Sequence, residues 1–242
     1  MKKSLFLVCL ITLSSSVFAE EYSPDRADRP EPIGFYSDGS LKNGARLPDE
    51  GPGFMKLFLE RNRNYGTNEI LDLITKTTAA MDKKFPNTDR LQVGDVAKEG
   101  GGLMSDLHAS HQNGLDVDVT YYRRNKVEQD INHTDGFSEV MVIKDTKISK
   151  NFDTGRVWEF LKKLHENGRV QRIFMDPVIK KELCRYATLL NETKQYTEVL
   201  RSLRPYVGHQ DHMHIRLRCP PDAKECRAQE EVPPGTGCGG RR

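Results

Sequence analysis

Beyond residues 1–19, the sequence contains no long hydrophobic run. That first segment opens with Met1 and two lysines, continues through an apolar stretch at 5–13 and ends in Ala19, which is typical of a secretory signal peptide cleaved after Ala19. Cys9 lies within the apolar stretch, so the pattern disfavours a lipid-anchored cysteine. No later stretch approaches the roughly 20 apolar residues of a membrane-spanning helix. We therefore expect an exported, soluble protein of the periplasm.

An excess of charge of one sign is also missing. The chain has 37 Lys and Arg against 35 Asp and Glu, and two of the lysines belong to the predicted signal peptide. A protein that binds nucleic acid usually clusters its basic residues, and no segment of this chain does so. We therefore expect no nucleic-acid partner. No exposed apolar stripe indicates an oligomeric state, which the sequence leaves open.

Cysteine is sparse, and four cysteines remain once the signal peptide is removed: Cys184, Cys219, Cys226 and Cys238. An even number in an exported protein favours disulfides over thiol chemistry. Four cysteines allow three pairings, and the sequence alone does not choose between them. The short segment between Cys219 and Cys226 favours that pair, which leaves Cys184 with Cys238. Each bridge would stabilise the fold by about 2 to 4 kcal/mol.

Capping residues and apolar residues at helical spacing predict three helices. We expect them to begin after Thr67, Asp153 and Asp176. The first should end before Pro86 and the second before Gly168.

Alternation of apolar and polar residues predicts strands at 114–122 and 212–218, with a further strand at 169–175. The first places Asp116 and Asp118 on its polar face, which we expect to be open to solvent. The second places its two histidines on one face, directed toward a common site.

These elements alternate without a regular βαβ order, which favours the α+β class. We expect a central antiparallel sheet that carries the functional site and is flanked by helices. Residues 22–54 lack hydrophobic periodicity and predict an extended N-terminal arm, while disulfides should hold the C-terminal tail. No repeat or charge block divides residues 20–242, so we expect them to form a single domain.

Histidine is scarce, yet its distribution is uneven. The chain has seven histidines, and five of them fall in the windows S-D-L-H-A-S-H-Q-N-G-L-D-V-D-V and G-H-Q-D-H-M-H-I-R-L. We interpret the isolated His133 and His165 as surface or structural residues. The two windows offer these candidate side chains: His108, His111, Asp118, His209, His212 and His214.

His111 and Asp118 can converge on one cation, because the six residues between them include Gly114 and suffice for a turn before the strand. His214 from the other strand would be the third ligand. Two histidines and one carboxylate, with a fourth position for water, are typical of a catalytic zinc site, whereas a closed structural zinc prefers Cys or four protein ligands. Ligand type favours zinc, although affinity alone would not identify the ion.

Several motifs together resemble a known family. His111-x6-Asp118 and His212-x-His214 resemble the zinc peptidases grouped around lysostaphin, D-Ala-D-Ala carboxypeptidases and the hedgehog fold. More closely, three segments and the Cys219 to Cys226 spacing resemble the penicillin-insensitive murein endopeptidases. The segments are S-H-Q-N-G-L-D-V-D at 110–118, G-H-Q-D-H-M-H at 208–214 and R-N-Y-G-T at 63–67.

The resemblance implies a role for each candidate. His111, Asp118 and His214 would bind zinc, and His212 would be the general base on the water. His209 would assist by stabilising the transition state, and His108 resembles a further metal-contacting position. The wider family has Ser two residues before the first ligand, where this chain has Ala109, so no role is assigned to Ser110.

The implied reaction is hydrolysis of the D-alanyl to meso-diaminopimelyl cross-link of peptidoglycan. A metal-activated water needs no acyl-enzyme, so penicillin should not inhibit. One alternative is a related D,D- or L,D-carboxypeptidase with the same metal chemistry, and another is a non-catalytic zinc or peptidoglycan-binding protein. Retention of His212 beside His214 argues against the last, because a binding module needs no base.

Two further features allow more than one interpretation. Asp116 shares a face with Asp118, where it either orients a metal ligand or is a solvated acid. The glycines at 100–102 form either a loop that a substrate backbone approaches closely or a plain turn.

Overall fold

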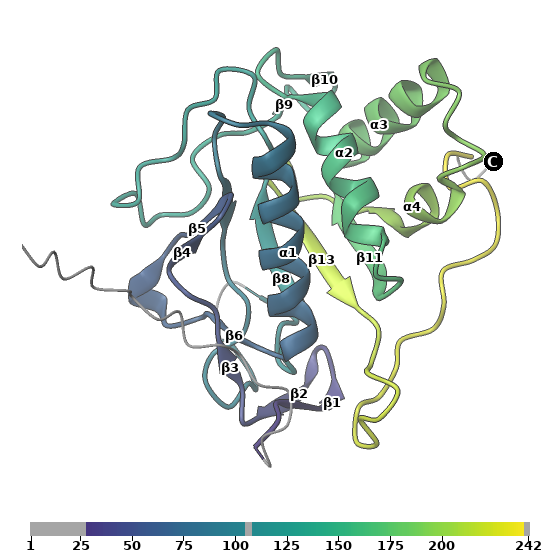
Figure 1. The fold of residues 1–242 in the computed structure, drawn as a ribbon. Coiled ribbons are helices and arrows are strands. Elements are labelled where there is room, and N and C mark those ends of the chain that lie inside the picture. The colour runs from purple at the N-terminus through teal and green to yellow at the C-terminus, as the bar shows by residue number, and fades with distance from the viewer. Residues whose placement is uncertain (1–27, 105–107, 240–242) are drawn as a thin grey trace, which may run out of the picture.

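The structure is a computed structural model that describes residues 28–104 and 108–239 (Figure 1). The predicted signal peptide at 1–19 lies outside these residues. The main element is a seven-stranded sheet in the order β12-β11-β13-β8-β7-β5-β4. Its strands are β4 (Glu50–Gly51), β5 (Phe54–Lys56), β7 (Leu91–Val93), β8 (Asp116–Thr120), β11 (Val170–Met175), β12 (Leu203–Pro205) and β13 (His212–Leu217).

The centre of the sheet is antiparallel, as expected for the predicted α+β class. β13 pairs antiparallel with both β11 and β8, and β8 pairs antiparallel with β7. Nearer the edges, β12 runs parallel to β11 and β5 runs parallel to β7. The antiparallel prediction therefore holds for the centre, while parallel pairs extend the sheet on both sides.

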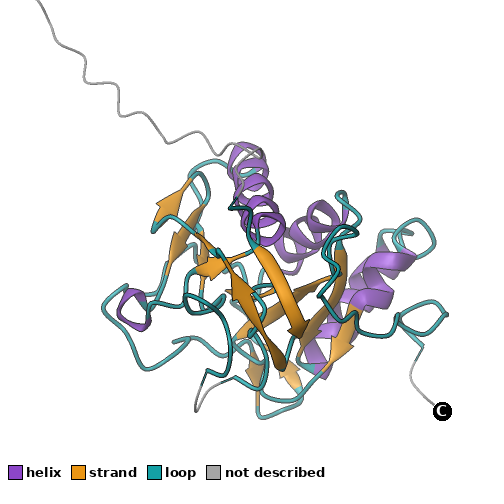
Figure 2. Ribbon diagram, turned by 90° about the horizontal axis from the view of Figure 1, so that it is seen from below, coloured by secondary structure: helices purple, strands orange, loops and turns teal. Residues whose placement is uncertain are grey.

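The helices gather on one side of the sheet (Figure 2). They are α1 (Asn68–Lys84), α2 (Thr154–His165), α3 (Pro177–Leu189) and the short α4 (Thr197–Ser202). Their apolar faces meet the apolar face of the strands in one core that includes Trp158, Phe160, Val119 and Ile215. The opposite face of the sheet is left for polar side chains, and the functional site lies there.

The three predicted helices are confirmed, together with the residues that precede them. The Asp153 carboxylate accepts a hydrogen bond from the backbone N–H of Arg156, and the Asp176 carboxylate accepts one from Val178. These bonds satisfy backbone donors that a helix start leaves without partners. Thr67 precedes α1 with an extended backbone, but its side chain makes no capping bond.

The N-terminal arm has more structure than its composition suggested. It contains the hairpin of β1 (Glu31–Phe35) and β2 (Asp38–Lys42), and β3 (Ala45–Arg46) pairs with β6 (Tyr65–Gly66). Its Tyr36, Leu41 and Leu47 side chains are buried. The arm thus contributes apolar side chains to the interior, and its last residues enter the central sheet. The remaining short elements are η1 (Leu59–Arg61), β9 (Val142–Ile143) and β10 (Lys147–Ile148).

Both favoured disulfides are present. Cys219 pairs with Cys226 across 7 residues, and Cys184 of α3 pairs with Cys238 across 54 residues. The second bridge holds the tail against the helical layer. Within residues 28–104 and 108–239, no helix combines the length and the apolar composition needed to cross a bilayer.

Candidate metal centre

The pairing of β8 with β13 brings the two histidine windows together. Asp118 lies opposite His214 in the antiparallel register, and Asp116 lies opposite Arg216. Because side chains two residues apart share a face of a strand, the acids of β8 and the basic residues of β13 point the same way. This face is the one that the helices leave uncovered.

The loop before β8 adds two more histidines. His111 has a positive φ of 69° and Gly114 one of 71°, so the chain turns sharply between them. A Cβ at Gly114 would meet the Leu41 side chain at 2.8 Å, which explains the requirement for glycine. The loop folds back over β8, and His111, Asp116 and Asp118 are all buried.

The expectation that the acidic face of β8 is open is therefore wrong. The exposed fraction of Asp116 is 0% and that of Asp118 is 1%. The loop that carries His111 covers them, and alternation along a strand specifies a face without specifying what covers it. Asp116 is not a solvated acid.

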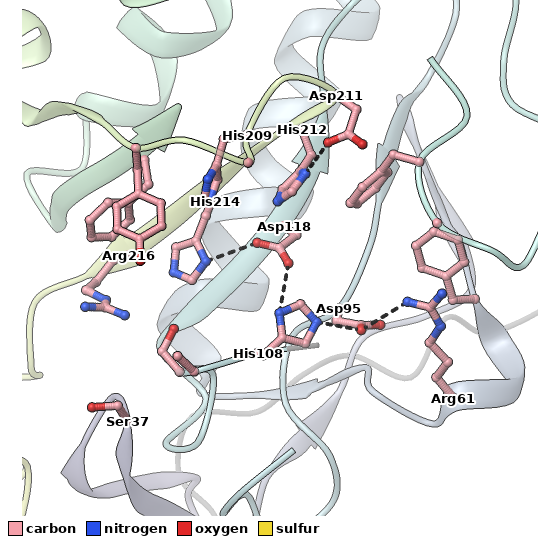
Figure 3. Close-up of a pocket in the computed structure, with 18 of the residues that line it drawn as sticks. Ser37, Arg61, Asp95, His108, Asp118, His209, Asp211, His212, His214 and Arg216 are labelled. Atoms are coloured by element: carbon pink, nitrogen blue, oxygen red, sulfur yellow. Dashed lines mark hydrogen bonds and ion pairs between the residues drawn. The ribbon is translucent and has the colours of Figure 1, made fainter. Parts of the chain in front are cut away.

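Four candidate ligands converge in one cluster, and Figure 3 labels three of them, His108, Asp118 and His214. His111 Nε2 lies 3.2 Å from His214 Nδ1 and 3.4 Å from Asp118 Oδ2. Asp118 Oδ1 is 3.1 Å from His214 Nδ1, and Asp118 Oδ2 is 3.5 Å from His108 Nδ1. Single ligand atoms of His108, His111 and Asp118 all lie within 4.8 Å of one another. The convergence predicted from the sequence is present.

The surroundings of each ring indicate which nitrogen carries its lone pair. His111 Nδ1 is 2.7 Å from the Val96 carbonyl oxygen. A carbonyl oxygen only accepts hydrogen bonds, so Nδ1 carries the proton of the neutral ring and Nε2 has the free lone pair. His214 Nε2 faces Asp116 Oδ1 at 3.2 Å, although no aligned hydrogen bond to it is formed among the described residues. That carboxylate favours a proton on Nε2 and leaves Nδ1 free.

This donor set fits a divalent cation. Two nitrogen lone pairs and the Asp118 carboxylate face one another, and they repel unless a proton or a cation lies among them. Asp118 Oδ1 is buried and has no hydrogen bond within the described part of the chain. Burial alone would raise the pKa of Asp118, but His111 and His214 hold it well below its usual range. The group therefore stays ionised, as a metal ligand must.

The His108 ring is held through its other nitrogen, on the side away from Asp118. Its Nε2 lies 2.9 Å from Asp95 Oδ2, and the same carboxylate oxygen contacts the guanidinium groups of Arg61 and Arg63 at 3.4 and 3.2 Å. Burial would raise the pKa of Asp95, but His108 and Lys56 lower it. This network directs His108 Nδ1 toward Asp118.

His212 lies beside the cluster with its ring held from two directions. Asp211 Oδ1 is 2.6 Å from His212 Nδ1, and the ring stacks on Phe137 with centroids 4.7 Å apart. Within the described chain, Nε2 has no hydrogen bond, so it is the nitrogen available for a proton. Burial lowers the pKa of His212, but Asp211 and Asp118 outweigh it and raise the pKa.

His209 lies on the loop before β13, against His212 and Tyr206. Its ring centroid is 4.8 Å from that of His212 and 5.3 Å from that of Tyr206. The Tyr121 hydroxyl donates to the His209 carbonyl at 3.1 Å and fixes the loop. Burial and the neighbouring His212 and His214 lower the pKa of His209 to about 4, so the ring is neutral at physiological pH.

A pocket of about 560 Å³ opens over the cluster. It extends to Phe58, Arg61 and Phe137 on one side and to Phe174 and Tyr206 on the other. His108, Asp118, His209, His212 and His214 all line it. The buried His111 does not line it and reaches the cluster from below.

Sequence reasoning missed several residues of this site. Asp95 and Arg61 come from segments without histidine, and no local pattern linked them to the site. Asp211 adjoins His212 in the sequence, so the window itself contained that signal. Phe137 and Tyr206 had no comparable signal.

The glycines at 100–102 serve the chain's own backbone. Gly101 has a φ of +66°, and a Cβ there would meet the Gln112 carbonyl oxygen at 2.1 Å and the Leu41 nitrogen at 2.4 Å. Gly102 donates its N–H to the same carbonyl at 2.8 Å. The plain turn, and not a substrate loop, explains the run.

His133 and His165 lie outside the cluster, as interpreted from the sequence. His133 is exposed. His165 Nδ1 donates to the Leu161 carbonyl oxygen at 2.8 Å, and its Nε2 is 2.8 Å from the Ser202 hydroxyl. His165 thus joins α2 to α4.

Comparison with known proteins defines the class and then the family. A sheet that carries histidines and a carboxylate under an open pocket agrees with a peptidase, and a peptidase family model matches residues 32–242. The chain belongs to this family, the penicillin-insensitive murein endopeptidases.

Curated relatives with the name penicillin-insensitive murein endopeptidase align over most of the chain. The protein of Haemophilus influenzae is 33% identical, with 89% of this chain and 73% of the relative covered. That of Pectobacterium atrosepticum is 32% identical, with 94% and 80% covered. That of Klebsiella pneumoniae is 32% identical, with 86% and 73% covered.

Proposed function

We propose that the protein is a zinc-dependent murein endopeptidase that hydrolyses the D-alanyl to meso-diaminopimelyl cross-link of peptidoglycan. Family membership supports the endopeptidase activity. The single observation that carries the metal assignment is the convergence of His111 Nε2, His214 Nδ1 and the Asp118 carboxylate within 3.1 to 3.4 Å of one another.

In this proposal His111, Asp118 and His214 hold the zinc, and His108 is a further metal contact next to Asp118. Two imidazoles and a carboxylate suit zinc better than the hard cations, which prefer oxygen ligands. Bound zinc would supply Lewis acidity, which lowers the pKa of a coordinated water and polarises the substrate carbonyl.

The chain's own groups would perform the proton transfers. His212 accepts a proton from the attacking water at Nε2, because its Nδ1–H is engaged by Asp211. The stacked Phe137 ring keeps the imidazole in that orientation. His209 lies next to His212 in the pocket, where it would stabilise the negative charge that develops on the carbonyl oxygen.

A water nucleophile requires no covalent acyl-enzyme. Penicillin inhibits peptidoglycan enzymes by acylating a nucleophilic serine, so it has no target in this mechanism. The proposal therefore includes insensitivity to penicillin.

The shape of the pocket favours an endopeptidase over a D,D- or L,D-carboxypeptidase. The lining continues from the histidine cluster toward Phe58 and Phe137 on one side and toward Phe174 and Tyr206 on the other. A peptide that continues beyond the scissile bond in both directions fits such a pocket. A carboxypeptidase needs only a short subsite on one side.

The family's substrate also suggests where the protein acts. We propose that residues 1–19 are a signal peptide, that residues 20–242 form a single domain and that the protein works on peptidoglycan in the periplasm. The two disulfides agree with an oxidising compartment.

The proposal is tested by muropeptide cleavage measured by mass spectrometry. Mature protein with zinc should convert cross-linked dimers to monomers, a chelator should abolish the reaction, and penicillin should leave it unchanged. His212→Ala at matched zinc occupancy should still bind the metal, but its cleavage rate should be lower by a factor of at least about 100. Wild-type protein that binds zinc and leaves every dimer intact would contradict the endopeptidase function and favour a carboxypeptidase or a binding protein.

A further inference from the structure

We propose that Asp116, fixed by Arg216, is a positioning residue that sets both His111 and His214 for metal binding. The inference rests on the proposed metal site and adds a residue that touches neither the metal nor the substrate. Of the two interpretations of Asp116 from the sequence, an orienting group or a solvated acid, the inference supports the orienting group.

Asp116 contacts both metal-binding segments at once. Its Oδ2 accepts a hydrogen bond from the His111 backbone N–H at 3.0 Å, and its Oδ1 lies 3.2 Å from His214 Nε2. One carboxylate thus joins the loop before β8 to the strand β13. These two ligands lie 103 residues apart in the chain, so the carboxylate connects segments that are distant in sequence.

The contact with His111 fixes an uncommon backbone conformation. A non-glycine residue with positive φ is disfavoured by about 1 kcal/mol or more, because its Cβ crowds the backbone. At 69°, His111 holds this conformation while its N–H points at Asp116. Without an acceptor there, the buried N–H would also lack a partner. Asp116 therefore stabilises the turn that directs the His111 ring into the cluster.

The contact with His214 selects a tautomer. A neutral imidazole can bind a metal only through the nitrogen that lacks the proton. The negative charge of Asp116 at 3.2 Å favours the proton on Nε2. Nδ1, which lies 3.1 Å from Asp118 and 3.2 Å from His111 Nε2, is then free for the metal. Carboxylates that accept from the distal nitrogen of a metal-binding histidine act in this way.

Arg216 keeps Asp116 in place. Its Nε and Nη2 donate to the two carboxylate oxygens at 2.7 and 2.9 Å, a bidentate pair with defined geometry. The guanidinium lies between the rings of Tyr36 and Phe174, at 4.2 and 5.2 Å from their centroids. Its Nη1 donates to Gln229 Oε1 in the tail at 3.0 Å.

A buried ion pair alone is weak evidence for a function, because apolar residues of similar volume often stabilise a fold equally well. Asp89 offers the matched comparison. It is also buried, accepts from the backbone N–H of Arg123 and forms an ion pair with Arg156, but it does not line the pocket over the histidines. A general structural role would make Asp116 and Asp89 equivalent.

The experiment compares Asp116→Asn with Asp89→Asn. Zinc affinity is measured by competition with a chromophoric chelator, and thermal unfolding is measured on the metal-free proteins. Both variants should unfold at a lower temperature than wild type. Asp116→Asn should also lose about 10- to 100-fold in zinc affinity, whereas Asp89→Asn should keep the wild-type affinity. Equal affinities in the two variants would overturn the proposal.

A second measurement needs no substitution at Asp116. Nitrogen-15 NMR of the metal-free wild type should find the proton of neutral His214 on Nε2, and a proton on Nδ1 would contradict the proposal. Should Asp116→Asn not fold, Arg216→Lys replaces it, since it keeps the charge but loses the bidentate pair. Its zinc affinity should fall, and an unchanged affinity would oppose the inference. If wild type binds no zinc, the proposed function fails. The NMR measurement of the His214 tautomer in the metal-free protein still tests the role of Asp116.

Discussion

Asp211 Oδ1 lies 2.6 Å from His212 Nδ1, and Nε2 of the same ring has no hydrogen bond among the described residues. On the other side, the Phe137 ring stacks on the same imidazole at an interplanar angle of 23°. The side chain that we propose as the general base is therefore oriented by a hydrogen bond and by an aromatic contact.

The Asp211 contact predicts a kinetic effect. Asp211→Ala should lower kcat by up to about 100-fold, the lower end of what a positioned general base contributes, because His212 loses its orientation. KM should change less than kcat, because Asp211 acts through the orientation of His212. Steady-state cleavage of a muropeptide dimer measures both constants. Asp72→Ala, at a half-buried position on α1 outside the pocket lining, is the control, and equal kcat values in the two variants would contradict the prediction.

Zinc should stabilise the folded protein measurably. A ligand that binds only the native state at about 100 times its Kd adds about 2.7 kcal/mol. For a chain of this size that corresponds to a Tm higher by roughly 5 to 10 °C. Asp118→Asn should lose most of this shift, because it removes the one carboxylate among the three proposed ligands. Differential scanning fluorimetry with zinc, and with magnesium as the control ion, provides the test; an equal shift in Asp118→Asn would count against Asp118 as a ligand.

The two disulfides should contribute unequally to stability. The loop closed by Cys184 and Cys238 spans 54 residues, and that closed by Cys219 and Cys226 spans 7. Loop-closure entropy assigns about 4 kcal/mol to the first bridge and about 2 kcal/mol to the second. Guanidinium unfolding of the two double Cys→Ser variants measures these losses. A larger loss for the short loop would show that chain entropy is not the main contribution.

His165 should make stability depend on pH. Burial lowers the pKa of its ring from 6.5 to about 4. In the unfolded chain the ring takes up a proton as the pH falls through about 6.5, while the folded ring stays neutral until about pH 4. The contribution of His165 to the free energy of unfolding is therefore complete above pH 6.5 and is lost as the pH falls toward 4. The total loss is up to about 3 kcal/mol.

The test compares His165→Gln with wild type in urea at pH 7.5, 6.0 and 5.0. The wild-type free energy of unfolding should fall more steeply toward low pH than that of the variant. His133→Gln changes an exposed histidine and should keep the wild-type slope. Parallel curves for wild type and His165→Gln would disprove the role of His165.

Local signals in the sequence sufficed for the helices and the main strands. Asp153 and Asp176 bond to backbone N–H groups within their own helices, so the features that define these starts lie within a few residues. The short strands at 31–46 could not be predicted, because each has only a few residues and depends on a distant partner. Hydrophobic periodicity does not develop over such lengths.

The histidine cluster was predictable because histidine is scarce and its residues share strand faces. The residues that surround the cluster could not be predicted from the sequence. Asp95 reaches His108 from the end of β7, and Arg61 reaches Asp95 from η1. The burial of Asp116 depends on how the loop at 108–114 folds over β8. Such contacts arise from tertiary packing, and no spacing within one segment encodes them.

The distance along the chain between the members of the cluster also bears on the order of folding. His111 and His214 meet across 103 residues, and Asp116 and Arg216 across 100. Contacts between distant residues form slowly, because a long loop must close before they stabilise anything. A nascent chain that ends before β13 lacks one ligand and the proposed base. If the proposed site binds zinc, its metal affinity therefore develops only when the whole chain has folded, and a chain that ends before β13 should be inactive.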